Sequence, residues 1–287
     1  MSEADGAANP GPSAKKQKTG AAQSLEDSLA GLAAIVTGSS SGVGAAVAKA
    51  LARRGCSVAI NYNSSKEGAE KVAEECRAAG AKAVVVIQAD VSQEAECKRL
   101  ATEAAKAFGR LDMLVNNAGT TKFCPLGDLD GLTGDDFTRI YQTNTVSAFN
   151  MIKFCSPYFK EAGAGRVVNV ASHAGVLHTI GSSLAYIGSK AALVAMTKAL
   201  GRALGPTIRV NAVCPGFIEG DWLKKGLGES RYDHIKGTLE EKLPLRAVST
   251  PDLVAENVLW LLTAAPNITG EAVVMDAGLG LMVGPAL

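Results

Sequence analysis

The sequence offers few groups that could bind a structural metal. Its 287 residues include three histidines and six cysteines, and no two cysteines stand at CxxC spacing. Structural zinc sites usually take their ligands from such close pairs, so we expect no metal. A chain of this length also needs no disulfides to stabilise its core, which predicts reduced thiols and a cytoplasmic protein.

A strong charge imbalance and long apolar runs are also missing. The formal net charge is +1 and the pI is about 7.6, which gives little attraction for nucleic acid or an anionic membrane. No apolar run reaches the roughly 18–20 residues that a membrane span requires. Hydrophobic residues make up 47% of the chain and charged residues 20%, the balance of a globular protein with a sizeable core. We therefore expect a small-molecule substrate, with no nucleic acid and no membrane as partner.

The N-terminal segment lacks large apolar side chains. It is small and polar and is interrupted by Pro10 and Pro12, so it cannot offset the entropy lost on ordering. It also lacks the apolar segment of a secretory signal. The basic "KKQK" at 15–18 could serve nuclear import or anion binding, but a solvated tail is the simpler interpretation. We predict a disordered tail over residues 1–30 and one domain over residues 31–287.

Seven short apolar segments follow the tail and alternate with segments of helical periodicity. The expected strands lie within residues 32–38, 57–62, 83–90, 111–119, 165–172, 208–216 and 270–278. Strands that alternate with helices in this way form a parallel sheet covered on both faces. The sequence therefore predicts an α/β fold, a single Rossmann-type doubly wound domain with a seven-stranded parallel sheet and helices on both faces.

Polar and glycine-rich clusters stand at the ends of these expected strands. They are residues 38–44, 61–65, Asp90, 116–119, Ser172 and 215–216. In open α/β sheets, ligands bind where the carboxyl ends of the strands meet their loops. One cluster would be ordinary turn chemistry, but six on one edge predict a binding site there.

The first cluster, "TGSSSGVG" at 37–44, leads from a strand into a helix. Glycines allow a tight turn and close approach of the backbone to an anion, and the helix N-terminus supplies N–H donors. A diphosphate would fit there. The spacing is G-x-x-x-G-x-G rather than G-x-G-x-x-G, so a plain strand-to-helix turn is the alternative.

The second expected strand ends in "NYNSSK" at 61–66. A dinucleotide site for NAD usually places a carboxylate there, which binds the ribose 2′-hydroxyl. This chain has the neutral Asn63, Ser64 and Ser65, then Lys66, and no carboxylate before Glu67. We predict NADP(H) in preference to NAD(H), although a neutral loop can accept either.

Tyr186 and Lys190 stand four residues apart in "AYIGSKAAL", so on a helix they share one face. Such a pair is often only a solvated helix surface. Together with "TGSSSGVG", "NNAG" (116–119), "TN" (143–144), "VASHAG" and "PGFI" (215–218), however, it resembles the ordered motifs of the short-chain dehydrogenase/reductase family. The resemblance extends from Leu32 to the end. It is nearest to the 3-oxoacyl-[acyl-carrier-protein] reductase and hydroxynaphthalene reductase group.

This resemblance implies four catalytic residues. Tyr186 would be the general acid/base, and Lys190 would hold the nicotinamide ribose. The ammonium and the oxidised nicotinamide would favour the phenolate and so lower the pKa of Tyr186. Ser172 would hydrogen-bond the substrate oxygen, and Asn144 would hold a water that links Lys190 to solvent.

The same resemblance implies a set of residues that bind the cofactor. Around the phosphates and along the second strand these are Gly38, Ser40, Ser41, Gly42, Val43, Gly44, Tyr62, Asn63, Ser64 and Ser65. Around the adenosine and nicotinamide they are Asp90, Val91, Asn117, Ala118, Gly119, Pro215, Gly216 and Ile218, with Tyr186 and Lys190. The family usually has threonine five residues after the proline, where this chain has Gly220. We expect that carboxamide contact to be lost or supplied by Asp221.

These residues predict an NADPH-dependent reductase of a ketone or other carbonyl, such as a 3-oxoacyl thioester, a ketoester or an aryl or cyclic ketone. One alternative is an NAD(P)-dependent alcohol or sugar dehydrogenase that works oxidatively. Another is an NADP-sensing regulator without turnover. Substrate choice is expected in residues 173–185 and 219–243, the second of which could form a lid. By resemblance, a homotetramer would form through the helices that carry Asn144 and Tyr186 and through the C-terminal strand.

Overall fold

The sheet of this protein is fully parallel. The computed structural model describes residues 29–177 and 180–282, so nearly all of the expected tail lies outside the described residues. The strands are β1 (Ala33–Val36), β2 (Ser57–Tyr62), β3 (Val84–Gln88), β4 (Met113–Asn116), β5 (Gly165–Val170), β6 (Ile208–Pro215) and β7 (Ala272–Met275). Their order is β3-β2-β1-β4-β5-β6-β7, which confirms the seven-stranded sheet expected from the sequence.

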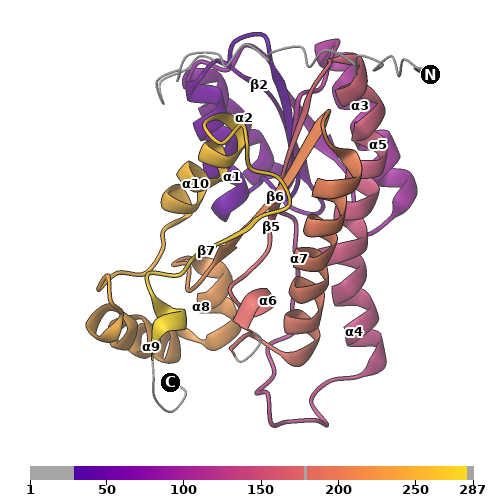
Figure 1. Ribbon diagram of the computed structural model, residues 1–287. Coiled ribbons are helices and arrows are strands. Elements are labelled where there is room, and N and C mark those ends of the chain that lie inside the picture. The colour runs from indigo at the N-terminus through magenta and orange to yellow at the C-terminus, as the bar shows by residue number, and fades with distance from the viewer. Residues whose placement is uncertain (1–28, 178–179, 283–287) are drawn as a thin grey trace, which may run out of the picture.

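Helices cover both faces of this sheet (Figure 1). One face carries α1 (Gly42–Arg53), α2 (Lys66–Ala78) and α10 (Pro251–Thr263), and the other carries α3 (Glu94–Phe108), α5 (Ser147–Glu161) and α7 (Leu184–Leu204). Leu51 and Leu259 lie in the core of the first face, and Leu100 and Phe159 lie in that of the second. The Rossmann-type doubly wound arrangement is therefore confirmed.

The remaining helices and helical turns lie beyond the carboxyl ends of the strands, at the lower end of Figure 1. They are α4 (Gly134–Tyr141), the π-helical turn η1 (Gln142–Val146), α6 (Ala174–Leu177), α8 (Asp221–Leu227), α9 (Glu229–Lys242) and the short turn η2 (Leu279–Leu281). The strand order reverses between β1 and β4, so the loops after these strands diverge at a topological switch point. Ligands of open α/β sheets bind at that point. Among the described residues, no helix has the length and apolarity to cross a membrane.

Asn61, at the end of β2, holds the edge of the sheet together at this point. Its side-chain oxygen accepts a hydrogen bond from the backbone N–H of Gly38 at 3.0 Å. Its side-chain nitrogen donates to the backbone oxygens of Ile87 (3.3 Å) and Ala89 (3.1 Å). The side chain is buried, and it joins the loops that follow β1, β2 and β3.

We predict that Asn61→Ala destabilises the protein by about 1–3 kcal/mol, because it leaves buried backbone groups without partners. The free energy of unfolding is measured by urea titration. Asn63→Ala is the control, since that side chain is exposed two residues further along. Equal, small effects of the two substitutions would contradict this role for Asn61.

Candidate active site

The loop after β1 forms a cradle for an anion at the start of α1. Gly38 and Gly42 have φ values of +61° and +56°, which favour glycine. A Cβ on Gly44 would lie 2.5 Å from the carbonyl oxygen of Gly38, so glycine lets the helix approach the loop. The Ser41 side chain does not cap α1. The N–H groups of the first turn therefore stay available to a ligand.

Thr37 and Asn117 join this loop to the loop after β4, across the switch point. The Thr37 hydroxyl accepts hydrogen bonds from the backbone N–H groups of Asn117 (3.0 Å) and Ala118 (3.1 Å). The Asn117 side chain donates to the carbonyl oxygens of Thr37 (2.9 Å) and Gly38 (3.0 Å). The structure therefore gives Asn117 a structural role, and it adds Thr37, which the sequence analysis missed although it begins "TGSSSGVG".

The loop after β2 packs beside the same cradle. A Cβ on Gly68 would lie 2.8 Å from both the Ser40 carbonyl oxygen and the Ser65 hydroxyl, so the two loops meet there. Residues 63–66 are exposed beside the cradle. The side chain of Tyr62 is instead buried among the core residues under α1 and α2.

The two residues predicted at the adenine lie at the end of β3. Asp90 is partly buried, and one of its carboxylate oxygens accepts the Ser92 N–H at 3.0 Å. Val91 is buried in the core beneath α3, so its side chain is not open to a ligand. Only Asp90 of this pair presents a partly exposed side chain.

Helix α7 presents Tyr186 and Lys190 toward the end of β5. Ser183 caps the helix and accepts the Tyr186 N–H at 3.3 Å. The Ser172 hydroxyl lies close enough to the phenol to lower its pKa, while the Lys190 ammonium donates to the Val170 carbonyl oxygen at 2.8 Å. The Lys190 nitrogen lies 5.8 Å from the centre of the Tyr186 ring. Three of the four predicted catalytic residues thus share one cluster.

Asn144 lies in the π-helical turn η1, next to the same cluster. Its side-chain oxygen accepts the Thr120 N–H at 2.7 Å, and its nitrogen donates to the Thr120 carbonyl oxygen and the Ser189 hydroxyl, each at 2.9 Å. A Cβ on Gly119 would lie 3.3 Å from the Asn144 side-chain oxygen and 3.7 Å from the Lys190 nitrogen. Gly119 therefore keeps open a narrow gap over both groups. The predicted water at Asn144 stays a prediction.

Burial shifts the pKa of both reactive side chains away from the charged form. It raises the pKa of Tyr186 to about 12, and the Ser172 hydrogen bond only partly opposes this effect. It lowers the pKa of Lys190 to about 8. The pKa of the phenol is thus higher than usual in this structure, whereas the sequence analysis expected Lys190 and the cofactor to lower it. Desolvation is the largest cause of this rise, and the lowering expected from Lys190 together with a bound oxidised nicotinamide stays a prediction.

The loop after β6 carries Pro215, Gly216 and Ile218. A Cβ on Gly216 would lie 2.9 Å from that of Asp276, so this turn packs tightly against the end of β7. Ile218 forms an isolated bridge with Ser249. The N–H of Gly220 donates to the hydroxyl of the buried Tyr232 at 3.2 Å. Asp221, the expected substitute for the missing threonine, is exposed as the first residue of α8.

Aromatic side chains form one wall beside Tyr186. The Trp222 ring, on α8, lies 6.2 Å from the Tyr186 ring and 5.5 Å from that of Phe123, between centroids. Gly226 packs on Phe123 so closely that any Cβ there would overlap the ring. Trp222 lies within residues 219–243, where substrate choice was expected, and the structure places its ring beside Tyr186. Phe123 was missed because its loop carries no motif.

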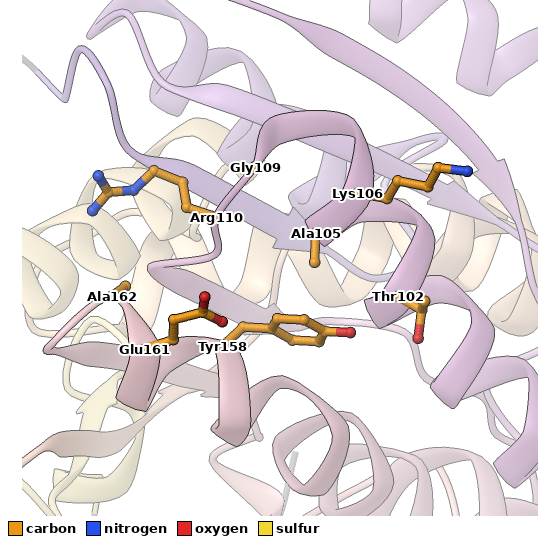
Figure 2. Close-up of a pocket in the computed structure, with 8 residues that line it drawn as sticks. All are labelled: Thr102, Ala105, Lys106, Gly109, Arg110, Tyr158, Glu161 and Ala162. Carbon is orange, nitrogen blue, oxygen red and sulfur yellow. The ribbon is translucent and has the colours of Figure 1, made fainter.

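The described residues also form a hollow of about 510 Å³ between the ends of α3 and α5 (Figure 2). Lys106 and Arg110 extend away from each other there, and Arg110 pairs with Asp112 at 2.6 Å. These helix ends precede β4 and β5, so they lie at the amino edge of the sheet. The predicted cofactor and catalytic residues lie at the other edge.

Comparison with known proteins identifies the family. The family model described as "Enoyl-(Acyl carrier protein) reductase" matches residues 38–280. A protein of Streptomyces violaceoruber named for a ketoacyl reductase of the granaticin polyketide synthase is 38% identical over 249 residues, which cover 87% of this chain and 96% of that protein. The 3-oxoacyl-[acyl-carrier-protein] reductase FabG of Staphylococcus aureus is 35% identical over 248 residues, 86% of this chain and 97% of FabG.

A solved structure agrees with these matches. A Burkholderia xenovorans protein described as a short-chain dehydrogenase/reductase shares 35% identity with a TM-score of 0.81, covering 88% of this chain and 98% of that one. The chain therefore belongs to the short-chain dehydrogenase/reductase family, as its motifs predicted. Membership makes it an oxidoreductase and implies a nicotinamide cofactor.

The buried Lys190 leads to a prediction about pH. Its pKa is about 8 in the folded chain and 10.5 for an ordinary lysine, so between these values the unfolded chain binds more protons. Stability from this residue therefore rises with pH across that window. We predict that wild type gains unfolding free energy relative to Lys190→Met as the pH rises from 7 to 10, measured by urea titration.

The exposed Lys198→Met, two helical turns further along α7, supplies the baseline for this comparison. A difference between wild type and Lys190→Met that stays constant with pH would contradict the lowered pKa of Lys190.

Proposed function

We propose that this protein is an NADPH-dependent carbonyl reductase in which Tyr186 donates the proton to the substrate oxygen. The observation that carries the proposal is the Tyr186 phenol, which lies beside the Ser172 hydroxyl and next to the buried Lys190 ammonium at the carboxyl edge of the sheet. Relatives named ketoacyl reductase and 3-oxoacyl-[acyl-carrier-protein] reductase support a carbonyl substrate.

The residues at the carboxyl edge fit a dinucleotide. The first turn of α1 would receive the diphosphate, and Gly119 leaves space over Lys190 where a side chain would intrude. The Lys190 ammonium would hold the ribose of the nicotinamide. When bound, the reduced cofactor supplies a hydride for the carbonyl carbon.

The chain's own residues orient the substrate oxygen and donate the proton to it. The Ser172 hydroxyl orients the substrate oxygen and stabilises charge that develops on it. The Tyr186 hydroxyl gives its proton to that oxygen. Because the pKa of the phenol is about 12, it is protonated at neutral pH and has a proton to donate. We propose that Asn144 holds the water through which Lys190 exchanges protons with solvent.

We further propose that the cofactor is NADP(H) rather than NAD(H). Support comes from residues 63–66, which lie exposed beside the cradle and offer neutral groups and the Lys66 ammonium. A 2′-phosphate there would meet no carboxylate before Glu67. In the predicted binding set, Asn63, Ser64 and Ser65 would therefore contact the phosphate.

The Lys66→Glu substitution tests this preference. We predict that it lowers the ratio of kcat/KM for NADPH to that for NADH by about tenfold, equivalent to about 1.4 kcal/mol, because the new carboxylate repels the phosphate. Lys82→Glu makes the same change of charge in the exposed segment before β3 and serves as control. An unchanged ratio in Lys66→Glu would contradict the assignment of this loop to the 2′-phosphate.

The aromatic wall of Trp222 and Phe123 supports an apolar substrate body beside the reacting carbonyl. Trp222 is about half exposed, so its ring has free surface to cover a ligand. Helix α8, which carries it, is bracketed by Gly220 and Gly228, and both have positive φ. We propose that residues 219–243 form the lid over the substrate.

We further propose that residues 31–287 form one domain around the seven-stranded sheet. All six cysteines are free and buried, which agrees with a reducing, cytoplasmic location.

Helix α4 exposes Phe137 and Tyr141, and helix α5 exposes Phe149. Val274 is exposed on the edge strand β7. These apolar surfaces are where the expected homotetramer would form.

Tyr186→Phe tests the proposed reaction. We predict a loss of about 10²–10⁴-fold in kcat for NADPH-dependent reduction of a β-ketoester, because the proton donor is removed. Oxidation of NADPH is followed by its absorbance, and NADPH binding, measured by fluorescence, should persist. Tyr158→Phe, in α5 at the opposite edge of the sheet, is the matched control. Turnover that survives in Tyr186→Phe would exclude this phenol as the donor.

A further inference from the structure

A buried hydrogen bond between two side chains joins the segment after β5 to the segment after β7. The Nδ1 atom of His173 lies 2.8 Å from a carboxylate oxygen of Asp276, and the two side chains are 3% and 8% exposed. The same carboxylate accepts the N–H groups of Gly278 (2.9 Å) and Gly280 (2.8 Å). His173 is therefore bonded to a turn more than a hundred residues away, which the motif analysis did not use.

The backbone of His173 contacts a third segment. Its N–H donates to the carbonyl oxygen of Pro215 at 2.8 Å. The N–H of Gly216 in turn donates to the carbonyl oxygen of Met275 at 3.1 Å, and Gly216 packs against Asp276. The loops after β5, β6 and β7 thus meet at His173 and Asp276.

Two of these loops carry residues of the proposed reaction. His173 directly follows Ser172, and Pro215 and Gly216 belong to the segment expected over the nicotinamide. Gly175, two residues after His173, packs against the backbone of Lys190, where a Cβ would lie 2.6 Å from the carbonyl carbon. A shift of His173 would therefore move Ser172 relative to both Lys190 and the nicotinamide loop.

The hydrogen bonds that Asp276 accepts stabilise its ionised form. Burial raises the pKa of Asp276, but the N–H groups of Gly280 and Gly278 and the His173 ring together lower it below its usual value. Asp276 is therefore a carboxylate, which accepts a hydrogen bond from the Nδ1 atom of His173. The Nε2 atom of His173 is buried and has no hydrogen-bond partner among the described residues.

We propose that His173 is a positioning residue for carbonyl reduction, which through Asp276 sets the spacing between the Ser172 hydroxyl and the loop of Pro215 and Gly216. This inference rests on the proposed function. Reacting groups must be held to within a fraction of an ångström, and a misplacement of about 1 Å can cost about 10²-fold in rate. The role of His173 is distinct from that of Ser172, because its side chain bonds to Asp276 rather than to the substrate.

Four substitutions at the two positions separate positioning from stability. His173→Asn keeps an N–H donor near the Nδ1 position, whereas His173→Gln moves the donor toward the Nε2 position and His173→Leu removes it. Asp276→Asn removes the charge of the acceptor. The exposed Lys106→Leu, in α3 near the opposite edge of the sheet, is the control for the introduction of a leucine. We measure kcat, the KM for a β-ketoester, NADPH binding by fluorescence, and thermal unfolding.

We expect kcat to fall by about 10–100-fold in His173→Gln and His173→Leu. His173→Asn should keep kcat within about threefold of wild type, since it retains the donor that Asp276 requires. The substrate KM should change less than kcat, because the substrate-contacting side chains are all present. The double variant His173→Leu with Asp276→Asn should be no slower than the slower single variant, as expected for residues that act through one contact.

Three results would overturn the positioning role. The first is a kcat for His173→Leu equal to that of wild type and Lys106→Leu. The second is an equal loss in His173→Asn and His173→Leu. The third is a loss that only follows the fraction of unfolded protein in the thermal measurement. A wild-type protein that binds NADPH but reduces no carbonyl would instead remove the proposed function, and the positioning role with it.

Discussion

The burial of the Lys190 ammonium is the constraint on which the site depends. A charged amine is costly to remove from water unless it is hydrogen-bonded, and here the Val170 carbonyl oxygen at the end of β5 accepts a hydrogen bond from it at 2.8 Å. That contact fixes α7 against the sheet and holds Tyr186 beside Ser172. The π-helical turn with Asn144 and the small Gly119 complete the surroundings of the ammonium. The Lys190 ammonium therefore both holds α7 against the sheet and lies beside the candidate catalytic residue Tyr186.

The fold could be predicted because its signals are local and periodic. Each strand is a short apolar segment, and α1 and α2 carry apolar residues at helical spacing, so the order of elements implies a parallel sheet. The irregular parts were harder. The π-helical turn Gln142–Val146 interrupts an otherwise continuous helical pattern, and nothing in its composition marks it. The sequence also gave no sign that Tyr62 is buried in the core while the next three residues are exposed.

The motifs identified most of the candidate site, but not the contacts between motifs. Tyr186, Lys190 and Ser172 are brought together as the resemblance implied. Thr37, Phe123 and Asp276 contribute through partners far along the chain, which no spacing rule reveals. The pKa of Tyr186 likewise depends on surroundings that form only in the folded chain. A neighbouring lysine suggested a lower value, whereas burial, which only the folded structure shows, raises the pKa to about 12.

The central claim is that the carboxyl edge of this sheet places a carbonyl between a hydride source and the Tyr186 proton. The most direct test uses NADPH deuterated at the transferred position of the nicotinamide, a β-ketoester as substrate and mass spectrometry of the alcohol. The account predicts one deuterium on the new carbinol carbon and an exchangeable proton on its oxygen. An alcohol without deuterium, or bound NADPH with no alcohol formed, would contradict it.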